Sequence, residues 1–148
     1  MKETMDFNRI LKALKQLGDL YDDTLTKTAL GIGISKQEAD VLLFIANNPQ
    51  HNTASNIAKH RSFSRAYVSK AVEKLTAGKL VDVIADGGDR RVQRLVTTDA
   101  AAEKSGLLQW EQRQFFKGAT RGISEKDMNI CLEVMERIAE NALAISRE

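Results

Sequence analysis

The stretch 53-TASNIAKHRSFSRAYVSKAVEKLTAGKLV-81 carries the signals of two short helices separated by a tight turn. Thr53 is a suitable N-cap for a first helix over residues 54–60, because its hydroxyl can accept a hydrogen bond from a backbone N–H of the first turn. Ser64 can cap a second helix over residues 65–77, which a glycine then ends. This order predicts a helix-turn-helix.

The second of these helices has two chemically different faces. Val68, Val72 and Leu75 recur at helical spacing and form its inner stripe. The opposite face carries short hydroxyls and cations, which donate hydrogen bonds to phosphates and base edges in a DNA groove. The candidate DNA-binding residues of this helix are Ser64, Arg65, Ser69, Lys70 and Lys74.

A β-hairpin follows directly. Residues 80–85 ("LVDVIA") and 91–97 ("RVQRLVT") predict two strands joined by the tip "DGGD". We expect Gly87 and Gly88 to supply positive φ angles in this tip. A helix-turn-helix followed by a two-stranded hairpin is a winged helix-turn-helix.

Three arginines crowd into residues 90–94 of this hairpin. The hairpin alone is compatible with a solvated surface loop, an anion-binding enzyme loop or a finger that contacts nucleic acid. The preceding helix-turn-helix favours the third interpretation. The candidate residues of the wing are Asp89, Arg90, Arg91 and Arg94.

Long helices flank the winged segment. Apolar residues recur at three- and four-residue steps over residues 6–29, Ser35 and Glu38 form a capping box for the next helix, and Ser124 caps the last one. These signals predict a mostly α (α+β) fold. We expect a single domain (1–148) with a winged helix-turn-helix part (35–97) and a helical dimerisation part (5–30 and 98–148).

The charge of the chain is unevenly distributed. Its formal net charge is only +2, but residues 53–97 hold nine basic and four acidic residues. A basic middle within an acidic frame indicates an anionic partner, although a solvated basic patch would show the same balance.

Several other classes of protein are disfavoured. The chain has two histidines and one cysteine, and none of them has metal-ligand spacing with an acidic residue. The segment "GIGIS" lacks the lysine and the spacing of a phosphate-binding loop. We therefore expect no catalysis, no metal and no cofactor. Because no apolar run could span a membrane and no secretory signal is visible, we expect a cytoplasmic protein.

The single cysteine and the aromatic residues leave two questions open. Cys131 lies on the apolar stripe of the last helix, where a buried, unreactive thiol is expected rather than a redox sensor. Trp110, Phe115 and Phe116 could line a small-molecule pocket or form plain core between helices.

Two stretches resemble the multiple-antibiotic-resistance regulator (MarR) family of bacterial transcription factors. Residues 53–81 are similar to the family's helix-turn-helix, and "DRRVQRLVTTDA" is similar to its wing. Asp89 and Arg91 match the family's Asp-x-Arg, whereas Thr97 and Ala101 stand where the family usually has Leu and Gly.

The resemblance implies specific roles for the wing residues. Arg91 would reach into or beside the minor groove, with Asp89 holding it. Arg90 and Arg94 would add phosphate contacts. It also implies a DNA-binding regulator, most often a repressor, that binds a pseudo-palindromic operator and responds to a small effector.

The first and last helices carry apolar stripes that a compact winged helix cannot cover, which predicts an interface. The resemblance implies that this interface forms a two-fold homodimer. A winged-helix module that binds an acidic protein, without sequence-specific DNA binding, is the alternative. The candidate interface residues are Phe7, Ile10, Leu14, Leu132, Met135 and Ile138.

Overall fold

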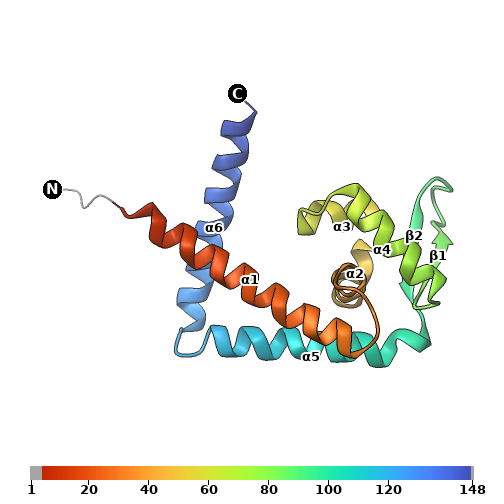
Figure 1. The fold of residues 1–148 in the computed structure, drawn as a ribbon. Helices are drawn as coiled ribbons and strands as arrows, with labels where there is room; N and C mark the ends of the chain where they lie inside the picture. The colour runs from red at the N-terminus through yellow and green to blue at the C-terminus, as the bar shows by residue number, and fades with distance from the viewer. Residues whose placement is uncertain (1–4, 148) are drawn as a thin grey trace. The chain divides into compact units, whose positions relative to one another are not determined.

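The computed structural model describes residues 5–147 and confirms the predicted fold class (Figure 1). Helices provide most of the secondary structure, and two short 3-10 turns, η1 (Pro49–His51) and η2 (Asp99–Ala101), accompany them. The predicted winged helix-turn-helix is present, with α3 and α4 followed by the β1–β2 hairpin. The elements are α1 (Phe7–Gly31), α2 (Lys36–Asn47), α3 (Ala54–Arg61), α4 (Arg65–Ala77), β1 (Val81–Ala85), β2 (Gln93–Thr97), α5 (Ala102–Ala119) and α6 (Glu125–Ser146).

Contacts divide the chain into two compact units, with the boundary in the sequence between Phe115 and Phe116. The first unit holds α1 to β2 and most of α5, and the second holds the end of α5 together with α6. The expectation of a single domain stays a prediction.

The predicted caps explain where the helices begin. Ser35 and Glu38 form the capping box of α2, with the Glu38 N–H donating to Ser35 Oγ at 3.1 Å. Thr53 and Ser64 cap α3 and α4 in the same way, each at 3.1 Å. Ser124 Oγ accepts the Asp127 N–H at the start of α6. These caps satisfy N–H groups that the first helical turn leaves without partners.

The core of the first unit forms around α2, which is buried over most of its length. Leu42 and Leu43 of α2 are nearly inaccessible, as are Ile57 of α3 and Val68 and Leu75 of α4. Burying a side chain of this size contributes about 1.5–3 kcal/mol. Helix α2 is therefore the scaffold on which α3 and α4 are mounted.

The hairpin is antiparallel, with Val81 opposite Thr97 and Ala85 opposite Gln93. Helix α4 packs against β1 beside it (Figure 1). The expectation of positive φ at Gly87 and Gly88 is wrong, because neither residue adopts it. Hydrogen bonds that the Asp86 carboxylate accepts from the Gly88 and Asp89 N–H groups shape the tip instead. The left-handed conformations near this region belong to Ser62 (φ 52°) and Lys79 (φ 59°), at the turns before and after α4.

The second unit consists mainly of α6. No described residue of α6 is buried. Gly122, with φ of +80°, allows the tight turn that precedes the helix. The expectation of a buried thiol is wrong for this single chain, because Cys131 is exposed.

Candidate nucleic-acid interface

All five candidate residues of the second predicted helix lie on or next to α4 and are exposed. Its opposite face is buried: Val68, Ala71 and Leu75 have essentially no accessible surface, and Val72 is half-buried. The inner face thus fixes the helix on the core and leaves the polar face open. The structure brings together on this face Ser64, Arg65, Ser69, Lys70 and Lys74.

Two hollows flank this face and contain residues that sequence reasoning missed. Ser55 of α3 shares one hollow with Arg65 and Ser69. Gln37 of α2 shares the other with Ser69 and Lys70. Both residues lie on helices whose sequence patterns carry only capping and packing signals. Their proximity to α4 arises from the tertiary fold.

Helix α4 is also held through a buried carboxylate. The Asp40 side chain is fully inaccessible, and its Oδ2 accepts hydrogen bonds from Tyr67 Oη at 2.7 Å and Lys36 Nζ at 2.6 Å. Lys36 also lies 3.2 Å from Asp22 Oδ1 on α1. Burial of the phenol, followed by its hydrogen bond to Asp40, raises the pKa of Tyr67 well above its usual range. These contacts tie the first turn of α4 to α2.

The tip of the wing is closed by its own hydrogen bonds. Asp86 Oδ2 accepts the N–H groups of Gly88 and Asp89, both at 3.0 Å, and the Asp86 N–H donates to the Val92 carbonyl. Asp89 Oδ1 in turn accepts the backbone N–H of Arg91 at 3.0 Å and its Nε at 3.3 Å. The pairing that the resemblance implies between Asp89 and Arg91 is therefore present in the structure.

The wing arginines are not equivalent. The side chain of Arg91 is 92% exposed, whereas that of Arg94 is 33% exposed. Arg94 Nε donates to Asp86 Oδ1 at 3.0 Å, and its Nη1 donates to Asn52 Oδ1 at 3.3 Å. The Arg94 hydrogen bond, followed by those of the Gly88 and Asp89 N–H groups, lowers the pKa of Asp86. Arg90, like Arg91, is exposed.

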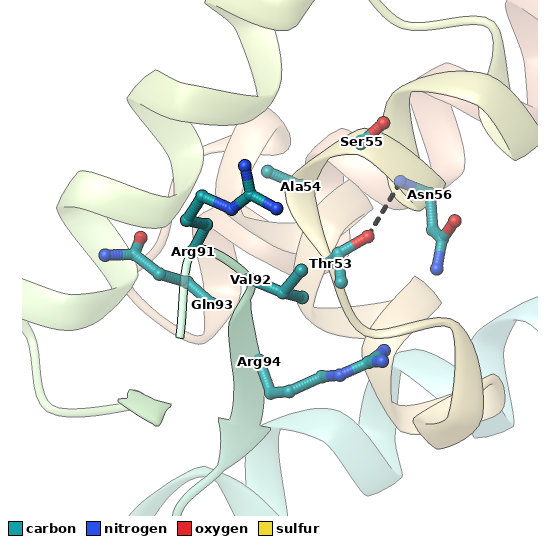
Figure 2. A pocket seen from close by; sticks show the side chains of 8 residues that line it. All are labelled: Thr53, Ala54, Ser55, Asn56, Arg91, Val92, Gln93 and Arg94. Atoms are coloured by element: carbon teal, nitrogen blue, oxygen red, sulfur yellow. Dashed lines mark hydrogen bonds between the residues drawn. The ribbon is translucent and has the colours of Figure 1, made fainter. Parts of the chain in front are cut away.

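A hollow of about 480 Å³ separates the start of α3 from the wing (Figure 2). In Figure 2, Arg91 and Arg94 leave the wing in different directions, with Arg91 near Ala54. The hollow is lined by Thr53, Ala54, Ser55, Asn56, Arg91, Val92, Gln93 and Arg94.

Residues 32–92 match the model of the MarR family. This segment begins after α1 and ends just before β2. This match covers less than half of the chain and includes its helix-turn-helix. The MarR family consists of DNA-binding transcriptional regulators with a winged helix-turn-helix, and it is not an enzymatic family. The family resemblance seen in the two sequence stretches is confirmed.

Solved structures of MarR regulators share this fold. The chain is similar to one from Listeria monocytogenes in complex with a 26mer DNA, at 17% identity and a TM-score of 0.78, over 95% of this chain and 89% of that one. It is also similar to a regulator from Oenococcus oeni PSU-1, at 14% identity and a TM-score of 0.76, over 91% and 99% of the two chains.

A third similar structure is CouR from Rhodococcus jostii RHA1, bound to p-coumaroyl-CoA. It has 17% identity and a TM-score of 0.75, and the alignment covers 88% of this chain and 91% of CouR. At these identities, the three likenesses show the fold alone. No curated protein matches the chain.

Two further observations concern metal binding and membrane spanning. Within residues 5–147, no cluster of three or more His, Cys, Asp or Glu side chains could bind a metal ion. Among the helices described, none has the length and apolar character needed to cross a membrane.

Proposed function

We propose that the chain is a homodimeric repressor that binds a pseudo-palindromic operator and is released by a small effector. The observation that carries this proposal is the pair of faces on α4, one locked into the core and the other exposed and cationic. A helix held in this way can enter the major groove, which is about 12 Å wide, without losing its place on the domain.

The exposed face of α4 has the chemistry of base and phosphate recognition. Arg65 and Lys70 supply cations for guanine edges or phosphates, and Ser64 and Ser69 supply hydroxyl donors. Lys74, one turn further along, would contact the DNA backbone. The burial of Val68 and Leu75 supports this assignment, because it fixes which side of α4 faces outward.

The wing would contact the adjacent minor groove. The Arg91 side chain is 92% exposed, more than Asp89, Arg94 or Asp86, and Asp89 accepts a hydrogen bond from its guanidinium. A narrow minor groove concentrates negative potential and favours an inserted arginine. Arg90 would add a phosphate contact beside it.

Exposed apolar residues support a homodimer. Phe7, Ile10 and Leu14 of α1 are 66%, 37% and 44% exposed, and Leu132 and Ile138 of α6 are 57% and 51% exposed. Met135 is half-buried. Stripes of this kind mark interfaces, and a two-fold dimer would present two copies of α4 to half-sites one helical turn apart.

The effector is proposed as a small aromatic molecule. CouR, which shares the fold, was solved bound to p-coumaroyl-CoA. Trp110 is 49% exposed and would be available to a ligand, although the same residue could pack in a dimer. Since the partner is DNA, we place the action of the protein in the cytoplasm.

Selection of bound sequences from random double-stranded DNA tests this function. We expect a two-fold motif and an affinity that falls steeply with salt, since cations on DNA release counterions. Binding without a preferred sequence, or an absence of DNA binding by the folded protein, would favour the alternative module that binds an acidic protein.

A further inference from the structure

The wing is attached to the helix-turn-helix through Asn52, which lies just before α3. Its backbone carbonyl accepts the Leu95 N–H at 2.8 Å, and its side-chain Nδ2 donates to the Leu95 carbonyl at 2.9 Å. Asn52 is therefore bound to β2 through one backbone and one side-chain hydrogen bond. The base of the wing is fixed to the segment that leads into α3.

Arg94 extends this attachment toward the tip. Its guanidinium donates to Asn52 Oδ1 on one side and to Asp86 Oδ1 on the other. The planar guanidinium presents several N–H donors in a fixed geometry, so one side chain can bridge two acceptors. Two-thirds of the Arg94 side-chain surface is covered, in contrast to Arg91.

Asp86 connects Arg94 to the tip residues next to Arg91. Its second carboxylate oxygen accepts the N–H groups of Gly88 and Asp89. Asp89 then holds Arg91 through both its backbone N–H and its Nε. A continuous series of hydrogen bonds thus runs from Asn52 through Arg94, Asp86 and Asp89 to Arg91.

We propose that Asn52, Arg94 and Asp86 are positioning residues that orient Arg91 for DNA without contacting DNA themselves. This inference rests on the proposed function and gives Arg94 a role different from the phosphate contact that the resemblance implies. The physical reason is entropic. The tip contains two glycines, and an unheld tip would have to be ordered at the moment of binding.

The sharpest test compares two acidic residues of the wing. Asp86→Ala removes a negative charge near DNA, so simple electrostatics predicts tighter binding, whereas the positioning role predicts a loss of about tenfold in affinity. Asp82→Ala is the matched control. Asp82 is an exposed acid of β1, and no hydrogen bond or ion pair within residues 5–147 involves its side chain. We expect Asp82→Ala to bind the selected operator as tightly as the parent or tighter.

The salt dependence distinguishes a positioning residue from a phosphate contact. Each phosphate contact contributes about 0.9 to the slope of log affinity against log salt. Arg91→Ala should lower that slope by about this amount. Arg94→Ala should weaken binding and leave the slope unchanged. The double variant Asp86→Ala/Arg94→Ala should lose no more affinity than the worse single variant, because both act through one series of bonds.

Melting temperatures show whether each variant is folded, and Asp86→Asn serves if Asp86→Ala unfolds. The amide oxygen of Asn can still accept a backbone N–H but no longer pairs as an anion with Arg94, so we expect a smaller loss than for Ala. The inference is overturned if folded Asp86 variants bind as tightly as Asp82→Ala, or if Arg94→Ala lowers the salt slope as Arg91→Ala does. Failure of the parent protein to bind any selected DNA would instead remove the proposed function.

Discussion

At the scale of single residues, the buried carboxylate of Asp40 stands out. A charge removed from water is tolerated only where partners replace its hydration. Asp40 Oδ2 has Tyr67 and Lys36, whereas Asp40 Oδ1 has no hydrogen-bond partner within the described part of the chain. The attachment of α4 to α2 therefore depends on two donors, Tyr67 and Lys36, that bind the same oxygen atom of Asp40.

Tyr67→Phe should lower the free energy of unfolding by about 1–3 kcal/mol, because it removes one of these two donors and leaves a buried charge less well paired. Tyr21→Phe is a suitable control. The Tyr21 hydroxyl accepts a hydrogen bond from the neutral amide of Gln112, and a bond between neutral groups is weaker than one to a carboxylate. Urea denaturation measures both variants. If both variants lost the same free energy of unfolding, the charge of Asp40 would add nothing to the strength of the Tyr67 hydrogen bond.

The raised pKa of Tyr67 also predicts a pH dependence. Because the folded protein binds this proton more tightly than the unfolded chain does, the contribution to stability is complete below the ordinary tyrosine pKa of about 10 and decreases as the pH rises above it. The parent should therefore lose stability between about pH 10 and 11 more steeply than Tyr67→Phe. Urea midpoints measured across this range test the prediction, and parallel curves would contradict it.

At the scale of elements, local signals could be read from the sequence and distant contacts could not. Ser35, Thr53 and Ser64 were predictable caps because each bonds within its own first turn. The bond between Asn52 and Arg94 joins residues 42 apart, and that between Asp40 and Tyr67 joins residues 27 apart. No local pattern encodes such pairs. The exposed face of α4 was predictable because helical periodicity separates it from the apolar stripe.

The prediction for the tip of the β1–β2 hairpin was wrong, because side-chain hydrogen bonds replace the expected glycine conformation there. Glycines in a hairpin tip commonly supply positive φ, and Gly87 and Gly88 were expected to do so. The carboxylate of Asp86 makes this unnecessary by accepting two N–H groups of the tip. The family resemblance implied Asp89 as a partner for Arg91. Asp86 was missed, and its own partner Arg94 lies on the opposite strand.

Substitutions at two neighbouring residues of α4, Lys74 and Leu75, test its exposed face and its buried face separately. Leu75→Ala should lower the free energy of unfolding by about 2–5 kcal/mol, because Leu75 is fully buried. Lys74→Ala should leave stability nearly unchanged and weaken operator binding. Denaturation and operator titration of both variants check the pair. If Lys74→Ala bound the operator as the parent does, the end of α4 would lie outside the DNA contact.

At the scale of the whole molecule, exposed apolar surface is the main unexplained feature of the single chain. Within α6, Ile130, Leu132, Val134, Ile138 and Leu143 are each about half exposed. Folding of one chain leaves this surface in water, where it contributes no hydrophobic stabilisation. The same exposure at Cys131 becomes understandable if a second copy covers the stripe on which the thiol lies. This exposed apolar surface is the observation that supports the proposed homodimer.

Sedimentation tests that homodimer directly. The parent should sediment as a dimer at micromolar concentration, and Leu132→Glu or Met135→Glu should dissociate or unfold it, because an unpaired carboxylate in an apolar interface is costly. Asn129→Glu adds the same charge to α6 away from the stripe and should remain dimeric. Loss of the dimer should also reduce operator affinity far more than half-site affinity, since only a dimer engages both half-sites at once. A folded, monomeric parent that bound the full operator with undiminished affinity would contradict the assembly.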